Sequence, residues 1–139
     1  MEILVVDDDP IIRETLEELL ETMGFSPVVA ADGDEAWNLF DKNPFRVAIC
    51  DWLMPGLDGL SLLKKIRSRP EICYCYFIML TGNVGIAQYR EAMDAGVDDF
   101  LPKPFDFKEM EIRLRVARRI VGYISHIQKL ESLLPICSH

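Results

Sequence analysis

The feature that most constrains the fold of this chain is a regular alternation of short apolar runs with amphipathic segments. Five apolar runs predict β-strands, and each is followed by a segment with the hydrophobic spacing of a helix. Such alternation implies an α/β protein, a doubly wound (βα)5 unit with a parallel sheet, right-handed crossovers and helices on both faces. The expected strands are residues 2–6, 27–31, 45–50, 74–80 and 98–101, and the expected helices are residues 10–23, 34–41, 60–69, 84–95 and a last one beginning near residue 106.

Breakers and capping residues fix several of these boundaries. Asp9 followed by Pro10 is typical of a helix start, because the aspartate caps the helix and proline suits its first position. Gly24 and Gly96 follow two of the expected helices and are expected to end them. The run 74–80 is almost continuously apolar, which predicts a strand covered on both faces.

Acidic residues end two of the expected strands. Asp51 follows the run 47–50, and Asp7 and Asp8 follow the run 3–6. If these strands are parallel neighbours, three carboxylates converge at the sheet edge where α/β proteins bind ligands. Two unit charges 4 Å apart repel by about 4 kcal/mol at an effective dielectric constant near 20, so the cluster requires a cation or raised pKa values. A group of carboxylate oxygens favours a hard cation such as Mg²⁺.

Three further residues belong to the same predicted edge. Thr81 follows the fourth strand, Lys103 follows the fifth, and Phe100 lies within the fifth. Each has an ordinary structural interpretation when taken alone, as a loop hydroxyl, a surface lysine or a core aromatic. In the same way, an isolated Asp-Asp pair before a helix is usually a cap. The combination, and not any single residue, indicates a functional site.

The combination resembles the receiver domain of bacterial two-component response regulators. The resemblance spans roughly residues 1–121 and comprises separated motifs in the correct order, which together are highly specific. It implies a flavodoxin-like sheet with strand order 2-1-3-4-5. The motifs are the acidic pair Asp7-Asp8, Asp51 in Asp-Trp-Leu-Met-Pro-Gly-Leu-Asp-Gly, Thr81-Gly82, Phe100, and Lys103-Pro104-Phe105.

The resemblance assigns the phosphoryl chemistry to Asp51. It implies that Asp51 accepts a phosphoryl group from a sensor histidine kinase or phosphotransfer protein, so the chain would be a signalling switch and not an enzyme. It also implies that Asp8, Asp51 and the Leu53 carbonyl bind Mg²⁺, while Asp7 acts mostly through bound water.

The remaining motif residues are implied to sense the phosphoryl group. Lys103 would pair with Asp51 at rest and with a phosphate oxygen after transfer, and Thr81 would donate its hydroxyl to the phosphoryl group. Phe100 would be the aromatic switch, and because it lacks the hydroxyl of the commoner tyrosine, the switch would act through rotation of its ring. The Lys103–Pro104 bond is a candidate cis peptide. For Trp52 and Tyr89, the sequence does not distinguish a packing role from contact with a partner protein.

Two other interpretations compete with this one. A haloacid-dehalogenase-type phosphatase would use Asp7 as nucleophile and Asp9 as general acid, with Asp98-Asp99 as a second acidic pair. It is opposed by the lack of room for a cap domain, by Pro10, and by the absence of a role for Asp51. A pseudo-receiver would use the fold for protein interaction without phosphorylation. Absence of Mg²⁺ binding would favour the pseudo-receiver.

Charge and composition further narrow the possible classes of protein. Residues 1–106 hold 9 basic and 20 acidic side chains, whereas residues 107–139 hold 6 basic and 3 acidic ones, within an overall net charge of −8. This split predicts an acidic metal-binding body and a basic helix, not a nucleic-acid-binding domain. No apolar run approaches the roughly 18 residues of a membrane span, so we expect a soluble, cytoplasmic chain. Its four cysteines are expected to be reduced thiols.

The C-terminal segment is predicted to extend beyond the receiver domain. We expect a receiver at residues 1–121 and a helical extension or linker at residues 122–139, leading to an output domain that the sequence does not contain. We predict a homodimer formed through the fourth and fifth helices, near Arg113 and Arg115, and through a parallel coiled coil. The alternative is that the first two seam residues pack on the sheet. The apolar seam, at spacings of four and three residues, is Val116, Ile120, Tyr123, Ile127, Leu130 and Leu134.

Overall fold

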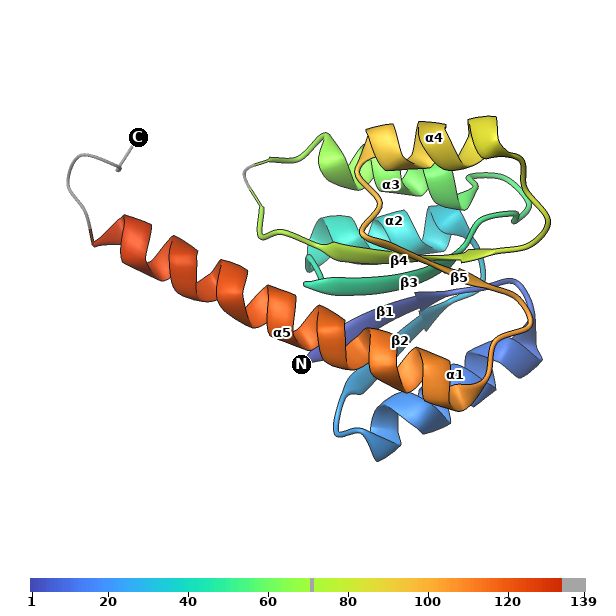
Figure 1. Ribbon diagram of the computed structural model, residues 1–139, viewed down its shortest axis with the longest axis horizontal. Coiled ribbons are helices and arrows are strands. Elements are labelled where there is room, and N and C mark those ends of the chain that lie inside the picture. The colour runs from blue at the N-terminus through green and yellow to red at the C-terminus, as the bar shows by residue number, and fades with distance from the viewer. Residues whose placement is uncertain (71, 134–139) are drawn as a thin grey trace.

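A computed structural model describes residues 1–70 and 72–133 of the chain (Figure 1). The described residues form five strands and five helices in strict alternation, as predicted. The strands are β1 (Glu2–Val6), β2 (Ser26–Ala30), β3 (Val47–Asp51), β4 (Tyr76–Thr81) and β5 (Asp99–Pro102), and the helices are α1 (Pro10–Thr22), α2 (Gly33–Lys42), α3 (Gly59–Arg67), α4 (Ile86–Ala95) and α5 (Phe107–Ser132).

The sheet is parallel and has the order β2-β1-β3-β4-β5, which confirms the expected flavodoxin-like topology. Its register aligns the carboxyl ends of the central strands. Val6 lies opposite Cys50, and Asp51 lies opposite Leu80. The residues that follow β1 therefore meet Asp51 at one edge, which is where the sequence predicted a site.

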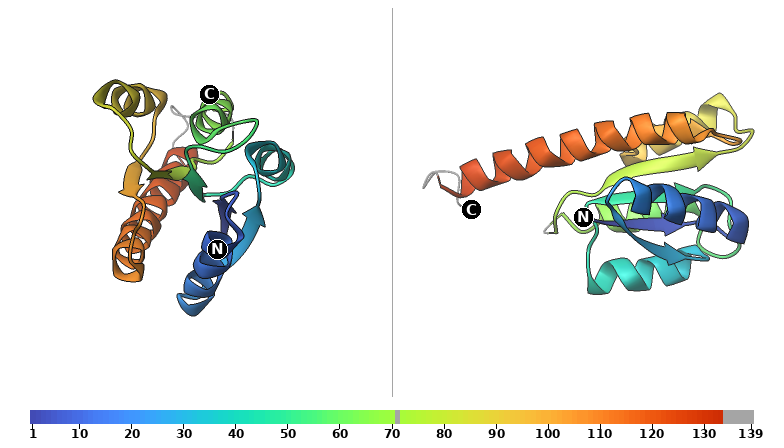
Figure 2. Two further views of the ribbon diagram at one scale, coloured as in Figure 1. Left: turned by 90° about the vertical axis from the view of Figure 1, so that its right-hand side faces the viewer. Right: turned by 90° about the horizontal axis from the view of Figure 1, so that it is seen from below.

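Helices cover both faces of the sheet (Figure 2). Helices α1 and α5 pack on one face, and α2, α3 and α4 pack on the other. Every residue of β4 is buried, as the continuous apolar run predicted. The helix side chains buried on the α1/α5 face are Leu16, Leu20, Met110, Leu114, Ala117 and Val121, and those on the other face are Ala36, Phe40, Leu62, Leu63, Ile66 and Ala92.

Aspartates cap most of the helices. The Ile11 N–H donates to Asp9 Oδ1 at 2.9 Å, and Pro10 is the first helical residue, so the predicted start of α1 is confirmed. Asp32, Asp58 and Asp106 accept from a backbone N–H in the same way at the starts of α2, α3 and α5. Helix α4 differs, because its N-cap is Gly85 and it has no side-chain cap.

Strand β4 begins at Tyr76, two residues later than predicted, because Arg67 forms hydrogen bonds with polar groups of the two preceding residues. The Arg67 guanidinium donates to the Cys75 carbonyl at 2.7 Å and to the Tyr74 hydroxyl at 3.3 Å. The Tyr74 hydroxyl also bonds to Asp98. Residues 74 and 75 are therefore bonded to α3 and to the α4–β5 turn instead of to β3.

The cysteines of the described residues are free thiols, as predicted. Cys50 and Cys75 are buried, and Cys73 is half-buried. Burial, together with the neighbouring Asp51 charge, raises the pKa of the Cys50 thiol and keeps it protonated beside the acidic cluster. Cys137 lies outside the described residues.

Helix α5 runs past the body of the domain (Figure 1), which confirms the extended C-terminal helix. Its buried residues end at Val121, and the helix continues through Gly122 to Ser132. Ser125 accepts a hydrogen bond from Arg46, so the first turns beyond Val121 still touch the body. No helix of the described chain, α5 included, is both long and apolar enough to cross a membrane.

The predicted seam lies mostly on the exposed side of α5. Val116, Tyr123, Ile127 and Leu130 are exposed, and Ile120 is half-buried against the core. The alternative in which Val116 packs on the sheet is therefore wrong, since the neighbouring residue Ala117 takes that position. The last seam residue, Leu134, lies outside the described residues.

Candidate functional site

The predicted carboxylates converge at the carboxyl edge of the sheet. Asp7 and Asp8 follow β1, and Asp51 is the last residue of β3. One carboxylate oxygen from each lies within 4.8 Å of the other two. Asp7 is fully buried and Asp51 almost so, whereas Asp8 is exposed, so the cluster opens to solvent on the Asp8 side.

Lys103 provides the positive charge of this cluster. Its ammonium nitrogen lies 2.9 Å from Asp7 Oδ2 and 3.2 Å from Asp51 Oδ2. Its backbone N–H donates to the Thr81 carbonyl at 2.7 Å, and the peptide bond that joins it to Pro104 is cis, as anticipated. The sequence predicted the pairing with Asp51, but it gave no sign that Asp7 would be nearer.

Asp7 keeps one oxygen available for a further partner. Its Oδ1 accepts from the Asp9 N–H at 2.9 Å. Its Oδ2 is buried, and its polar contact among the described residues is the Lys103 ammonium at 2.9 Å. A carboxylate oxygen can accept from a second donor as well. This one fits a water molecule held by a cation, which is the role expected for Asp7, and the all-oxygen cluster fits Mg²⁺.

The cluster perturbs the acidity of its members. Burial raises the pKa of Asp51, and the Asp7 charge adds to this, which together outweigh the lowering by Lys103. Burial acts to lower the pKa of Lys103, but Asp7 and then Asp51 reverse the effect and leave it raised. Lys103 is therefore an ammonium at neutral pH and stabilises two neighbouring negative charges.

The loop after Asp51 is fixed by a close approach of α3. A Cβ at Gly59 would lie 2.5 Å from the Asp51 carbonyl oxygen, so only glycine allows α3 to begin there. The Gly59 N–H donates to the Trp52 carbonyl at 2.8 Å, and Asp58 caps the helix by accepting from Ser61 at 2.8 Å. Asp58 thus has the capping role that its position suggests. Leu53 lies in this loop, with its side chain 68% exposed.

Aromatic rings surround the predicted switch. Phe100 stacks on Trp52 with ring centroids 6.3 Å apart, and the Tyr89 and Phe100 rings form a T-shaped pair with centroids 4.8 Å apart. Thr81 is fully buried, and its Oγ1 lies 3.4 Å from the Tyr89 hydroxyl. The structure thus brings Thr81 and Phe100 together through Tyr89. The sequence left Tyr89 and Trp52 unassigned, and both prove to pack around Phe100.

The second acidic pair lies apart from the cluster. Asp98 accepts from the Phe77 N–H at 2.7 Å and pairs with Arg67 at 2.9 Å, near the start of β4. Asp99 lies 3.6 Å from Arg113. Asp98 and Asp99 have these structural partners, and Asp9 is a helix cap, which opposes the phosphatase interpretation.

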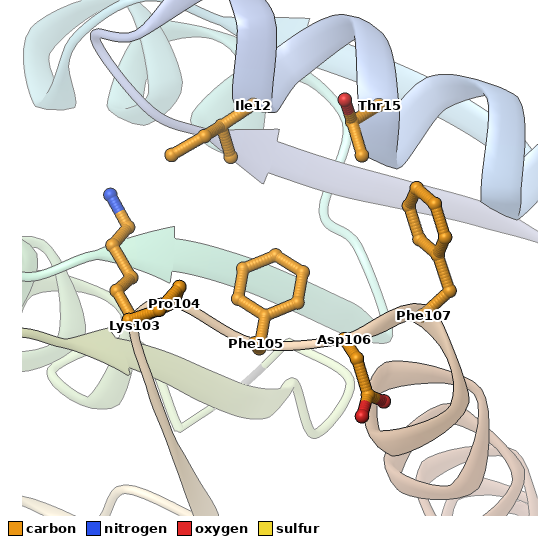
Figure 3. Close-up of a pocket in the computed structure, with 7 residues that line it drawn as sticks. All are labelled: Ile12, Thr15, Lys103, Pro104, Phe105, Asp106 and Phe107. Carbon is orange, nitrogen blue, oxygen red and sulfur yellow. The ribbon is translucent and has the colours of Figure 1, made fainter.

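An apolar groove adjoins the site (Figure 3). It has a volume of about 560 Å³ and lies between α1 and the segment that leads from β5 into α5. Ile12 and Thr15 form one wall, and the opposite wall runs from Lys103 to Phe107, whose ring is exposed. Lys103 therefore belongs both to the groove and to the acidic cluster.

Comparison with known protein families agrees with the site described above. The family model of the response regulator receiver domain matches residues 3–115, so this chain belongs to the response regulator receiver domain family. Receiver domains are signalling domains of two-component systems and not classical enzymes, and they generally bind Mg²⁺ at an acidic pocket.

Relatives and solved structures agree with this assignment. Response regulator MprA of Mycobacterium sp. strain KMS is 38% identical over 117 residues, which is 84% of this chain and 50% of MprA. Transcriptional regulatory protein TctD of Salmonella typhimurium strain LT2 is 32% identical over 135 residues, 96% of this chain and 59% of TctD. The structure of chemotaxis protein CheY4 of Vibrio cholerae superposes with a TM-score of 0.77 at 29% identity, covering 84% of this chain and 97% of CheY4. The chain spans about half the length of the curated relatives it matches.

Proposed function

We propose that this chain is a phosphorylation-dependent switch in which Asp51 accepts a phosphoryl group from a histidine kinase or phosphotransfer protein. The observation that supports this best is the position of Asp51, at an open sheet edge between two further carboxylates and the Lys103 ammonium. An Asp51 oxygen would attack the phosphorus while the bond from phosphorus to the donor histidine nitrogen breaks. The product is an acyl phosphate, as in aspartyl-phosphate enzymes.

The surrounding residues would position and neutralise the phosphoryl group. Asp8, Asp51 and the Leu53 carbonyl would hold Mg²⁺, and Asp7 would contact it through water. When bound, Mg²⁺ supplies positive charge next to the phosphoryl oxygens. Lys103 would exchange its contact with Asp51 for a phosphoryl oxygen, and Thr81 would turn its hydroxyl toward the same group.

The groove beside Lys103 is a candidate docking site for the protein that donates the phosphoryl group. A histidine side chain must approach within bonding distance of Asp51, so its protein must rest on the rim of the site. The groove between α1 and Phe107 is apolar and adjoins Lys103. We propose that a helix of the kinase or phosphotransfer protein packs there.

Treatment with acetyl phosphate tests the proposed chemistry without a cognate kinase. We expect intact-mass spectrometry to show one added phosphoryl group in millimolar Mg²⁺ and at least about tenfold less in EDTA, because three anionic groups would otherwise face the dianionic donor. A chain that gains no phosphoryl group in Mg²⁺ would favour the pseudo-receiver interpretation.

We propose the domain division of residues 1–121 and 122–139, with dimerisation through α5. Support comes from the burial of α5 side chains, which ends at Val121, and from the exposed apolar stripe at heptad spacing beyond it. A stripe of this kind is seldom left in water. Arg113 and Arg115 on the proposed α4/α5 face have partners within the chain, Asp99 and Glu111, which a dimer interface would have to rearrange.

Charges placed in the stripe should weaken self-association. We expect Ile127→Glu combined with Leu130→Glu to raise the dimer dissociation constant by at least about tenfold, because each interface would bury unpaired carboxylates. Sedimentation of the full chain at high micromolar concentration, with and without beryllofluoride as phosphoryl mimic, measures this. His126→Glu combined with Gln128→Glu adds the same number of carboxylates at exposed positions outside the seam and should leave the dimer intact. A wild-type chain that is monomeric in every state would contradict the coiled coil.

A further inference from the structure

Thr81 has a single side-chain partner, and that partner comes from α4. The Thr81 side chain is fully buried at the end of β4. Within the described part of the chain, the Tyr89 hydroxyl at 3.4 Å is the only hydrogen-bond partner of Thr81 Oγ1. Because a buried hydroxyl is costly to leave unbonded, this contact favours the Thr81 rotamer seen here.

Tyr89 also contacts the aromatic residues of the site. Its ring forms T-shaped pairs with Phe100, at a centroid distance of 4.8 Å and an interplanar angle of 80°, and with Trp52, at 6.4 Å and 90°. Trp52 directly follows Asp51 in the chain. One side chain of α4 therefore touches Thr81, Phe100 and the residue next to the proposed phosphoacceptor.

Helix α4 has few other attachments to the body. Ala92 is the only buried residue among Ile86–Ala95, a range that is fully described. The helix starts without a side-chain cap at Gly85, whose N–H is instead satisfied by Gln88 Oε1 at 2.7 Å. The other attachments are an ion pair between Glu91 and Lys64 of α3 at 3.2 Å and the packing of Ala95 on the core, so Tyr89 is the residue of the first turn of α4 that contacts Thr81 and Phe100.

We propose that Tyr89 is a positioning residue that couples Thr81 to α4. Its hydroxyl holds Thr81 in the resting rotamer, and it is released when the Thr81 hydroxyl turns toward a phosphoryl group on Asp51. This inference rests on the function proposed above. It gives the switch a hydroxyl that Phe100 lacks, and it places that hydroxyl on α4, one of the two helices of the proposed dimer face.

The geometry allows the two contacts of Thr81 to exclude each other. Hydroxyl pairs hydrogen-bond best at about 2.7–2.8 Å and usually within about 3.0 Å, so the Thr81–Tyr89 contact at 3.4 Å is long and weak. A change of Thr81 from one staggered χ1 rotamer to another displaces Oγ1 and breaks so long a contact. The weakness of the contact also sets a modest size for the expected effect.

A double-mutant cycle on Thr81 and Tyr89 tests the coupling. The probe is beryllofluoride with Mg²⁺, titrated against the emission of Trp52 in a Trp37→Phe background, where Trp52 is the only remaining tryptophan. Tyr89→Phe keeps the ring and removes the hydroxyl, so it should tighten the apparent beryllofluoride affinity about two- to fivefold, the range of a weak hydrogen bond lost from the resting state. In a Thr81→Val background the same substitution should change the affinity less than about 1.5-fold.

Controls separate this coupling from simple packing. Tyr74→Phe removes a tyrosine hydroxyl that bonds to Asp98 before the start of β4, at the opposite end of the strand from Thr81, and should have no effect on the affinity. Urea unfolding of every variant shows whether the fold is retained. Equal shifts by Tyr89→Phe in both backgrounds would mean that the Tyr89 hydroxyl acts independently of Thr81, and no shift in either background would mean that Tyr89 acts through its ring alone. Either result would overturn the proposal while leaving the role of Asp51 intact. A wild-type chain without a saturable response that depends on Asp51 would refute both proposals.

Discussion

Asp51→Asn should accept no detectable phosphoryl group from acetyl phosphate, which corresponds to a loss of at least about a hundredfold. An uncharged amide replaces the carboxylate oxygen that would attack phosphorus, and no acyl phosphate can form on it. Intact-mass spectrometry in Mg²⁺ measures the loss. The matched control is Asp58→Asn in the same loop, because asparagine caps a helix about as well as aspartate and Asp58 serves α3 as its cap. That variant should be phosphorylated as fully as the wild type.

The same substitution should stabilise the fold at neutral pH in the absence of Mg²⁺. The pKa of Asp51 is raised in the folded state, by burial and then by Asp7, so the folded chain binds this proton more tightly than the unfolded chain. The stability that this proton contributes is complete below the unfolded pKa, near 4, and is lost as the pH rises through the folded pKa. Urea unfolding at pH 7 should therefore favour Asp51→Asn, and the advantage should shrink toward pH 4. A variant that is less stable at pH 7 without Mg²⁺ would contradict this reasoning.

Lys103→Met should be the most damaging substitution for the resting site. Among the described residues, Lys103 is the only cation paired with Asp7 and Asp51, and removing one partner of a buried pair leaves the other charges uncompensated. We expect the free energy of unfolding at pH 7 to fall by about 1–3 kcal/mol, below the full cost of a buried pair because the Lys103 side chain is 23% exposed. Beryllofluoride affinity should fall at least about tenfold, since an ammonium contact to the phosphoryl oxygens is lost.

Magnesium distinguishes a charge effect of this substitution from a packing effect. If the missing charge is the cause, millimolar Mg²⁺ should restore most of the lost stability of Lys103→Met, because the cation replaces the ammonium among the carboxylates. Lys42→Met, at an exposed position in the last turn of α2, should lose little stability and show no such rescue. A loss at Lys103 that Mg²⁺ leaves unchanged would argue against a shared site for the two cations.

The site residues at the carboxyl edge of the sheet were predictable, because each follows an apolar run whose length and breaking residues can be recognised in the local sequence. Asp51, Thr81 and Lys103 could be placed from such runs, and a parallel sheet brings strand ends together. The burial of Asp7 and the exposure of Asp8 could not be predicted, since the two are adjacent and differ only in the direction that β1 gives them. The contact between Lys103 and Asp7 spans three strand spacings of the sheet, and no local pattern encodes it.

Errors in the predicted elements have the same long-range origin. Tyr74 and Cys75 belong to an apolar run, yet the Tyr74 hydroxyl and the Cys75 carbonyl accept hydrogen bonds from the Arg67 guanidinium, and the strand is shorter than predicted. In α5, Val116 and Ala117 are both apolar, and only contact with the sheet decides that Ala117 is buried. Tyr89 could not be assigned to the site, because its role depends on where α4 rests relative to Thr81.

The most direct test is to identify the side chain that carries the phosphoryl group. Wild-type chain treated with acetyl phosphate and Mg²⁺ can be reduced with borohydride, which converts an aspartyl phosphate to homoserine, and peptide mass spectrometry then locates the converted residue. We expect conversion at Asp51 alone, and at least about tenfold less conversion when Mg²⁺ is removed by EDTA. Conversion at Asp7, with Asp51 unchanged, would contradict it and would support the phosphatase interpretation.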